Sequence, residues 1–280
     1  MILLQIVLAA LFVAATSVLL PVSAPGRADA QILDPGRGHE DGCDRPDAPP
    51  NSPSDLSKVG PVVLARYFGV TDRYQHGVLG DALEAEGLLV RYEDGERVIC
   101  DTVLAVPERV FEDTAPRLAD MNGDGVNEVI AVASHRSFGA RLELYGYPGL
   151  GQDFQLLSHT PYIGTAFRWL APVGVADFDD DGRLDIAYVE TPHLGKVLKI
   201  VTPEDGELVE IASAPGFSNH RIGDRFIYGG IRDCGNGPEI VLADGAWRRA
   251  VAVRMEATEL VSRDLAPLET PQSLETMLKC

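Results

Sequence analysis

Two acidic stretches hold the residues whose types and spacing are best suited to chemistry. Numbered from its first aspartate, each stretch has side-chain oxygens at positions 1, 3, 5 and 9 and a glycine at position 6. The side chains are Asp120, Asn122, Asp124 and Glu128 in the first stretch and Asp177, Asp179, Asp181 and Asp185 in the second. Because carboxylates this close repel one another, their crowding indicates a cation that turns the repulsion into attraction.

We predict that this cation is calcium, which takes roughly 6–8 hard oxygen ligands in adaptable geometry. The glycine at position 6, Gly125 or Gly182, lets the chain turn tightly with positive φ. Position 7, Val126 or Arg183, then offers its backbone carbonyl. All the protein ligands of each site come from one contiguous loop, which leaves little of the coordination sphere for a substrate. The two calcium ions are therefore expected to be structural.

An EF-hand begins with the same spacing but is excluded here. It requires a bidentate glutamate at position 12 and a helix on each side of the loop. Position 12 is Ala131 in one stretch and Tyr188 in the other, and the flanking residues have the pattern of strands.

The chain around these loops is predicted to be all-β. From residue 59 onward, short runs rich in β-branched and aromatic residues alternate with Gly, Asp or Pro turns. No segment shows a sustained helical stripe. Such runs include residues 127–134, 140–147, 184–190 and 196–203.

The acidic loops also mark an internal repeat. Asp120 and Asp177 lie 57 residues apart, and Asp233 follows 56 residues later in a shorter version of the pattern. A weaker unit around Asp81 makes four units of about 55 residues, the size of a propeller blade. We predict a small β-propeller of four four-stranded blades, with an atypical fifth blade as the alternative. Residues 60–69 are expected to add a strand to the last blade and close the ring.

The segments "LADMNGDGVNEVIAV" and "VADFDDDGRLDIAYV" resemble the core of FG-GAP/VCBS repeats, the calcium-loop blades also found in integrin α-chain propellers. The resemblance is strong over 116–134 and 172–190, fair over 218–255 and weak over 73–99. It implies calcium ligands at Asp120, Asn122, Asp124, Val126 (backbone) and Glu128, and at Asp177, Asp179, Asp181, Arg183 (backbone) and Asp185. No metal is carried over to "DCGNGPE", which is shorter and lacks a third carboxylate, or to the first unit.

The N-terminal region predicts export. Residues 1–20 hold no charged side chain, and "ADA" at 28–30 fits a cleavage site, so residues 1–30 are interpreted as a secretory signal peptide. The alternative is an uncleaved membrane anchor at 1–20. Either places the body outside the cytoplasm, in the periplasm or the extracellular space. Residues 31–58, rich in Pro, Asp, Gly and Ser, are predicted to be a linker or N-terminal arm, and 59–280 the propeller.

Four scattered cysteines agree with an oxidising compartment. Cys43, Cys100, Cys234 and Cys280 have no CxxC pair and no metal-finger spacing. They predict up to two disulfides, with three possible connectivities.

The formal net charge of −18 opposes binding to nucleic acid, which needs clustered Lys and Arg. We expect a binding or scaffold module whose partner is an unknown protein or glycan, with membrane contact only if residues 1–20 remain as an anchor. No GxSxG, HExxH or phosphate-loop motif is present, and no catalytic residue is assigned. The alternative is a hydrolase or lyase that uses a polar central channel around His76 and His220, with Arg221 and Asp224 beside them.

Four aromatic residues are predicted to pack between blades rather than to form a binding platform. They are Phe167, Trp169, Phe226 and Tyr228.

Overall fold

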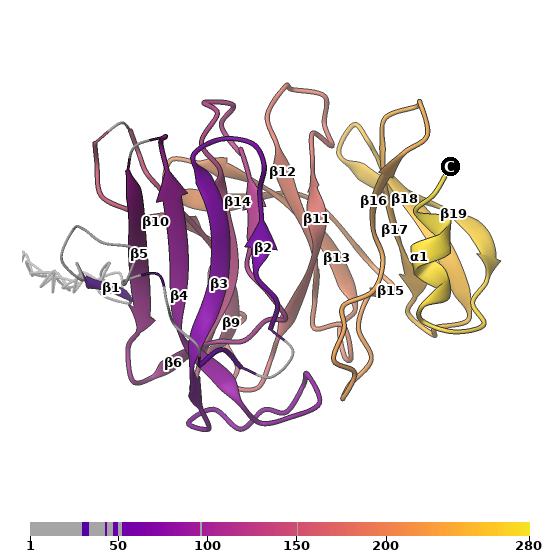
Figure 1. Ribbon diagram of the computed structural model, residues 1–280. Helices are drawn as coiled ribbons and strands as arrows, with labels where there is room; N and C mark the ends of the chain where they lie inside the picture. The colour runs from indigo at the N-terminus through magenta and orange to yellow at the C-terminus, as the bar shows by residue number, and fades with distance from the viewer. Residues whose placement is uncertain (1–29, 34–42, 44–46, 50–51, 96, 150) are drawn as a thin grey trace, which may run out of the picture.

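The regular secondary structure of the described part of the chain is almost entirely β-strand, which confirms the all-β class. The computed structural model describes residues 30–33, 43, 47–49, 52–95, 97–149 and 151–280 (Figure 1). The strands are β1 (Ala30–Leu33), β2 (Asp55–Leu56), β3 (Val62–Thr71), β4 (Glu84–Glu93), β5 (Val98–Ala105), β6 (Arg109–Phe111), β7 (Arg117–Ala119), β8 (Glu128–His135), β9 (Gly139–Gly146), β10 (Gln155–His159), β11 (Leu170–Ala176), β12 (Asp185–Glu190), β13 (Val197–Glu204), β14 (Glu207–Pro215), β15 (Phe217–Ser218), β16 (Gly230–Asp233), β17 (Pro238–Asp244), β18 (Arg249–Glu256) and β19 (Glu259–Pro267). A short helix, α1 (Ser273–Met277), follows the last strand.

Antiparallel pairing groups these strands into four sets. The first set is β1–β5, the second β6–β10, the third β11–β14 and the fourth β15–β19. Single residue pairs, Ala85 with Phe111 and His159 with Glu207, join the first three sets into one continuous sheet. The fourth set forms a separate five-stranded sheet. The curled sets follow one another side by side, a propeller-like arrangement (Figure 1).

Apolar clusters hold neighbouring sets together. Strand β8 shows how, because successive side chains of a strand point to opposite faces. Val129 and Ala131 join a cluster with the first set, whereas Ile130 and Val132 join a cluster with the third. A further cluster packs the third set on the fourth. Burial on both faces explains why the central strands read as nearly continuous apolar runs.

The two disulfides fasten the terminal segments onto the first and fourth sets. Cys43 bonds Cys100 of β5, and Cys234 bonds Cys280 beyond α1. The helix covers the fourth set through Leu274, which is fully buried in a cluster with strands β17 and β18. Of the three disulfide connectivities that the sequence allows, the structure contains Cys43–Cys100 with Cys234–Cys280.

The first set departs from the predicted repeat. Residues 60–69 fall largely in β3, which pairs with β2 and β4, so their predicted place in the last blade is wrong. The residues just before β3 lie at the acidic-loop end of the sheets, where Asn127 Nδ2 donates to the Val59 carbonyl at 2.7 Å.

The loop after β3 (residues 72–83) lies at the opposite end. There the Phe167 amide donates to Tyr74 Oη at 3.0 Å, and the Gly223 amide donates to the Val78 carbonyl at 3.0 Å. The weak repeat at 73–99 therefore places its loop away from the other acidic loops.

Among the other predicted segments, residues 1–29 lie outside the described part of the chain. Within the predicted arm at 31–58, Gln31–Leu33 continue β1, which pairs with β5, and Asp55–Leu56 form β2. No helix in the described ranges is long and apolar enough to cross a membrane.

Replacing both Cys234 and Cys280 by serine is expected to lower the Tm. The bridge spans 46 residues. A disulfide of this kind contributes about 2–4 kcal/mol, which corresponds to a fall of about 5–10 °C. Calorimetry of wild type and variant in oxidising buffer measures the difference.

The Cys43–Cys100 bridge remains in this variant, so dithiothreitol should still lower its Tm, but by less than it lowers that of the wild type. Equal Tm values for variant and wild type without reductant would contradict the fastening role of the bridge.

Candidate metal-binding loops

Each acidic loop connects two consecutive antiparallel strands of a set, β7 to β8 in the second set and β11 to β12 in the third. Asp120 follows β7 directly and Asp177 follows β11 directly, while Glu128 and Asp185 are the first residues of β8 and β12. The strand register pairs Ala119 with Glu128 and Ala176 with Asp185. The same register in both sets therefore brings the acids at positions 1 and 9 to the neck of the loop.

In both loops, the same three hydrogen bonds run from backbone amides to the acids at positions 1, 5 and 9. The amide at position 6 donates to the acid at position 1, the amide at position 7 to the acid at position 5, and the amide at position 2 to the acid at position 9. The bonds are Gly125 to Asp120 (3.0 Å), Val126 to Asp124 (2.8 Å) and Met121 to Glu128 (2.8 Å), and Gly182 to Asp177 (2.9 Å), Arg183 to Asp181 (2.8 Å) and Phe178 to Asp185 (3.1 Å). The loops are thus shaped in the same way despite their different sequences.

Some carboxylate oxygens remain unsatisfied by the protein. Asp120 Oδ1 and Asp185 Oδ1 are buried without a hydrogen-bond partner. In the second loop, ligand atoms of Asp177, Asp179 and Asp185 lie within 4.8 Å of one another. In the first loop, the side-chain amide of Asn122 donates from Nδ2 to Glu128 Oε1 at 3.1 Å. Hard oxygen donors converging at this spacing fit calcium chemistry.

The arrangement of the loops disfavours the ionised form of the acid at position 9. Burial, with the nearby charges of Asp124 and Asp120, raises the pKa of Glu128 to about 7. Burial, with the charges of Asp179 and Asp181, raises the pKa of Asp185 to about 6. A divalent cation beside these carboxylates would stabilise their ionised forms.

Positions 5 and 7 lie on the outer turn of each loop. In the second loop, the exposed Arg183 guanidinium bonds Asp181 Oδ2 at 2.7 Å. This ion pair lowers the pKa of Asp181 through the hydrogen bond from Arg183. Val126 and Arg183 lie at position 7, and calcium coordination by their backbone carbonyls stays a prediction.

The fourth set places an acid at the same register position. Arg232 of β16 pairs with Glu239 of β17, and Asp233 follows Arg232 as Asp120 follows Ala119. Glu239 is only 4% exposed. The loop after Asp233 is two residues shorter than the loop after Asp120, measured to the respective buried acid.

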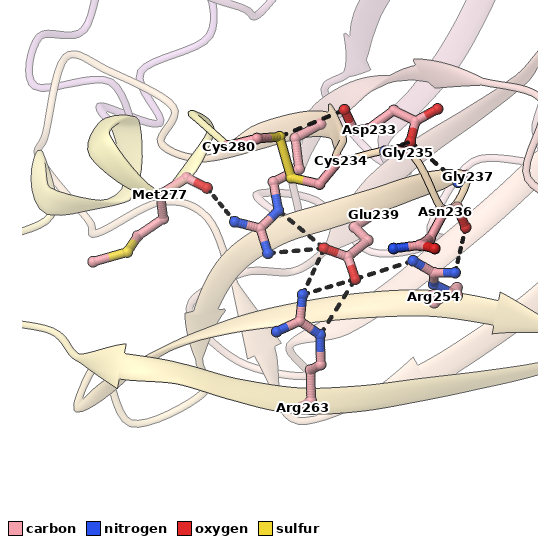
Figure 2. A network of polar contacts seen from close by, with 11 residues as sticks. Asp233, Cys234, Gly235, Asn236, Gly237, Glu239, Arg254, Arg263, Met277 and Cys280 are labelled. Carbon is pink, nitrogen blue, oxygen red and sulfur yellow. Dashed lines mark hydrogen bonds and ion pairs between the residues drawn. A yellow bond between two sulfur atoms is a disulfide. The ribbon is translucent and has the colours of Figure 1, made fainter.

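Guanidinium groups neutralise this third acid (Figure 2). Glu239 Oε2 accepts from Arg232 at 2.8 Å and from Arg263 at 2.8 Å, and Glu239 Oε1 accepts from Arg254 at 3.2 Å. Burial opposes ionisation, but the hydrogen bonds from Arg263, Arg232 and Arg254 lower the pKa of Glu239 to about 2. No local sequence pattern indicates this cluster, because the three arginines come from three different strands.

Comparison with known families agrees with the loop geometry. Residues 120–188 match the FG-GAP-like repeat family, and this segment spans both acidic loops. These residues are an FG-GAP-like repeat segment. No curated protein matches the chain.

The FG-GAP-like segment accounts for the loops but not for the predicted histidine site. His76 Nδ1 lies 2.6 Å from Glu112 Oε1, and His220 Nε2 lies 2.9 Å from the Asp224 carbonyl. His193 connects the two histidines, because its Nε2 lies 2.9 Å from His220 Nδ1 and it lines the same pocket as His76. No sequence motif distinguishes His193 from the other histidines.

Of the four aromatic residues predicted to pack between blades, two are buried and two are exposed. Trp169 is buried in the cluster between the second and third sets, as predicted, whereas Tyr228 is buried within the fourth set, in the cluster with β17, β18 and α1. The prediction is wrong for Phe167 and Phe226, whose side chains are 47% and 62% exposed.

Glu239→Gln is expected to lower the free energy of unfolding by about 2 kcal/mol at pH 7, because hydrogen bonds to a charged group are lost. The folded-state pKa of about 2 lies below the ordinary value of 4.5, so the carboxylate stabilises the fold above pH 4.5. That contribution is lost as the pH falls from about 4.5 to 2. Urea denaturation of wild type and variant across this range should show their difference shrinking.

Glu259→Gln is the matched control, since Glu259 is exposed at the start of β19. It should remain within about 0.5 kcal/mol of wild type at each pH. A Glu239→Gln deficit that stays constant down to pH 2 would contradict the charge-based account.

Proposed function

We propose that the protein is an exported, calcium-stabilised, propeller-like module that binds a partner or acts as a scaffold. An FG-GAP-like repeat and a propeller-like fold suggest an interaction or scaffold role. The observation that carries the calcium proposal is the pair of loops with the same backbone hydrogen bonds. Each contains a buried carboxylate oxygen with no protein partner, Asp120 Oδ1 or Asp185 Oδ1.

Calcium in these loops would stabilise the fold rather than perform chemistry. Each loop connects two strands that pack into the apolar clusters between sets. An ion that binds only the native state adds RT ln(1 + [L]/Kd) to its stability. Calcium is also not the ion generally used to generate a nucleophilic hydroxide.

Export is supported by the covalent structure. The two disulfides fit a protein that folds in an oxidising compartment. Together with the predicted signal peptide at residues 1–30, they support a periplasmic or extracellular location.

The partner proposed from the sequence is a protein or a glycan, and the charge of −18 supports no role with nucleic acid. An enzyme built around His76 and His220 is less well supported. Glu112 orients His76, but the Ser134 hydroxyl donates to Glu112 rather than to a histidine. The hydroxyl is therefore not arranged as a nucleophile activated by imidazole.

Saturating calcium is expected to raise the Tm of the purified chain relative to EDTA. For an extracellular-type affinity of about 0.1–1 mM, 10 mM calcium adds about 1.5–3 kcal/mol per loop. For two loops, this corresponds to an increase of about 5–15 °C. Differential scanning calorimetry with calcium, with magnesium and with EDTA measures the effect. A Tm that is the same in all three would overturn the calcium proposal.

Asp185→Asn tests whether the calcium-dependent increase in Tm comes from an ion bound in the second loop or from the overall negative charge of the chain. The variant loses a repulsive charge, so its Tm in EDTA should not fall below that of the wild type. It also loses a proposed calcium ligand, so its calcium-dependent increase in Tm should be about half that of the wild type. Asp205→Asn removes a charge from the exposed turn between β13 and β14 and is the matched control. The control should keep the full calcium-dependent increase.

A further inference from the structure

A cavity of about 280 Å³ lies among the ends of the sheets opposite the acidic loops. It is open to solvent on one side and is lined by loops from the first, third and fourth sets and from the connection between the second and third. Its lining includes His76, Phe167, Arg168, Trp169, Thr191 and His193. The volume accommodates one ring-sized ligand.

Two lining residues have strained backbones. Phe167 has a φ of 56° and Thr191 a φ of 46°, a region that β-branched and bulky residues rarely adopt. The Phe167 amide is fixed by its bond to Tyr74 Oη at 3.0 Å, and the Thr191 amide by its bond to the Trp169 carbonyl at 2.9 Å. Strain that the surrounding contacts hold in place is a feature of ligand sites.

The cavity also has a pre-positioned aromatic wall. The half-exposed Phe167 ring stacks on Tyr74, with 5.1 Å between centroids, and lies 5.5 Å from the His76 ring. The Trp169 ring is fixed because its Nε1 donates to the Glu112 carbonyl at 2.7 Å. It stacks against His193 with an angle of 15° between the planes. Rings that are already ordered lose little conformational entropy when a flat ligand binds.

A hydrogen-bond chain fixes the protonation of His193. The Asp224 carbonyl only accepts, so His220 Nε2 carries a proton and donates to it. Burial lowers the pKa of both histidines, that of His193 to about 4, so both are neutral near pH 7. His220 Nδ1 is then the acceptor of the His193 Nε2 proton, which leaves His193 Nδ1 as a hydrogen-bond acceptor.

We propose that this cavity binds a small molecule with a phenolic ring, whose face packs on Phe167 and whose hydroxyl donates to His193 Nδ1. The ordered aromatic rings favour one flat ring over a sugar, whose several hydroxyls would each need a partner. The inference rests on the proposed binding function and names the chemistry that one site accepts. The acidic loops lie at the other end of the sheets, so this proposal and the calcium proposal can fail separately.

Titration of the ¹⁵N-labelled full chain with p-cresol tests the proposal. The chain has two tryptophans, Trp169 and Trp247, whose indole signals a Trp247→Phe variant assigns. p-Cresol should shift the Trp169 signal saturably, with a Kd of ~1 mM or lower, and leave the Trp247 signal in place. Toluene has the same shape without the hydroxyl and should bind at least about 5-fold more weakly. No saturable shift of Trp169 with p-cresol, or a shift with glucose in its place, would overturn the proposal.

Three variants identify the groups responsible. Phe167→Ala should weaken p-cresol binding about 10-fold. Phe138→Ala is the matched control, because Phe138 is also half exposed but is not among the lining residues, and its affinity should stay within twofold of wild type. His193→Phe keeps a ring but removes the acceptor, so p-cresol and toluene should bind equally. Unchanged p-cresol affinity in Phe167→Ala would contradict the site.

Discussion

Three strand sets bury a carboxylate at the same register position, at the start of the strand that follows a loop beginning with aspartate, and burial disfavours the charge of each acid. Glu128 and Asp185 lie there in the FG-GAP-like segment, and Glu239 lies there in the fourth set. Burying an uncompensated charge costs several kcal/mol, which is comparable with the whole stability of a domain. In the fourth set, three arginines supply the charge. In the other two sets, the loop before the acid carries further carboxylates, and calcium is the positive charge proposed there.

The sequence was informative wherever the interacting residues are close in the chain. The side chains of each acidic loop fall within nine residues, and the two-residue period of the strands is local, so the loops and the all-β class could be predicted. The direction of the first set could not, because β3 and its neighbours have the same alternating pattern in either orientation. Nor could the arginines around Glu239, which lie up to 24 residues from it, or the exposure of Phe167, whose ring is held by Tyr74 93 residues away. Such contacts depend on which sheets become neighbours, and local propensity does not specify this.

The two candidate sites use opposite ends of the same rigid framework. One end presents carboxylate oxygens on short turns between paired strands, and the other presents aromatic rings and neutral imidazoles on longer connections. Between them, strands such as β8 are buried on both faces and leave little room for local rearrangement. This division agrees with the general observation that a packed scaffold fixes the loops in which binding groups lie. It also explains why the charge of the acidic end need not disturb the apolar cavity.

The loop after β3 also bears on how the chain matures. Ribosomes deliver this loop early, yet the partners that immobilise it, Phe167 and Gly223, emerge about 90 and 145 residues later. Contacts between such distant segments form slowly, because a long loop must close before they yield any stabilisation. The hairpin formed by β3 and β4 therefore cannot dock its connecting loop until both of these later segments have been synthesised.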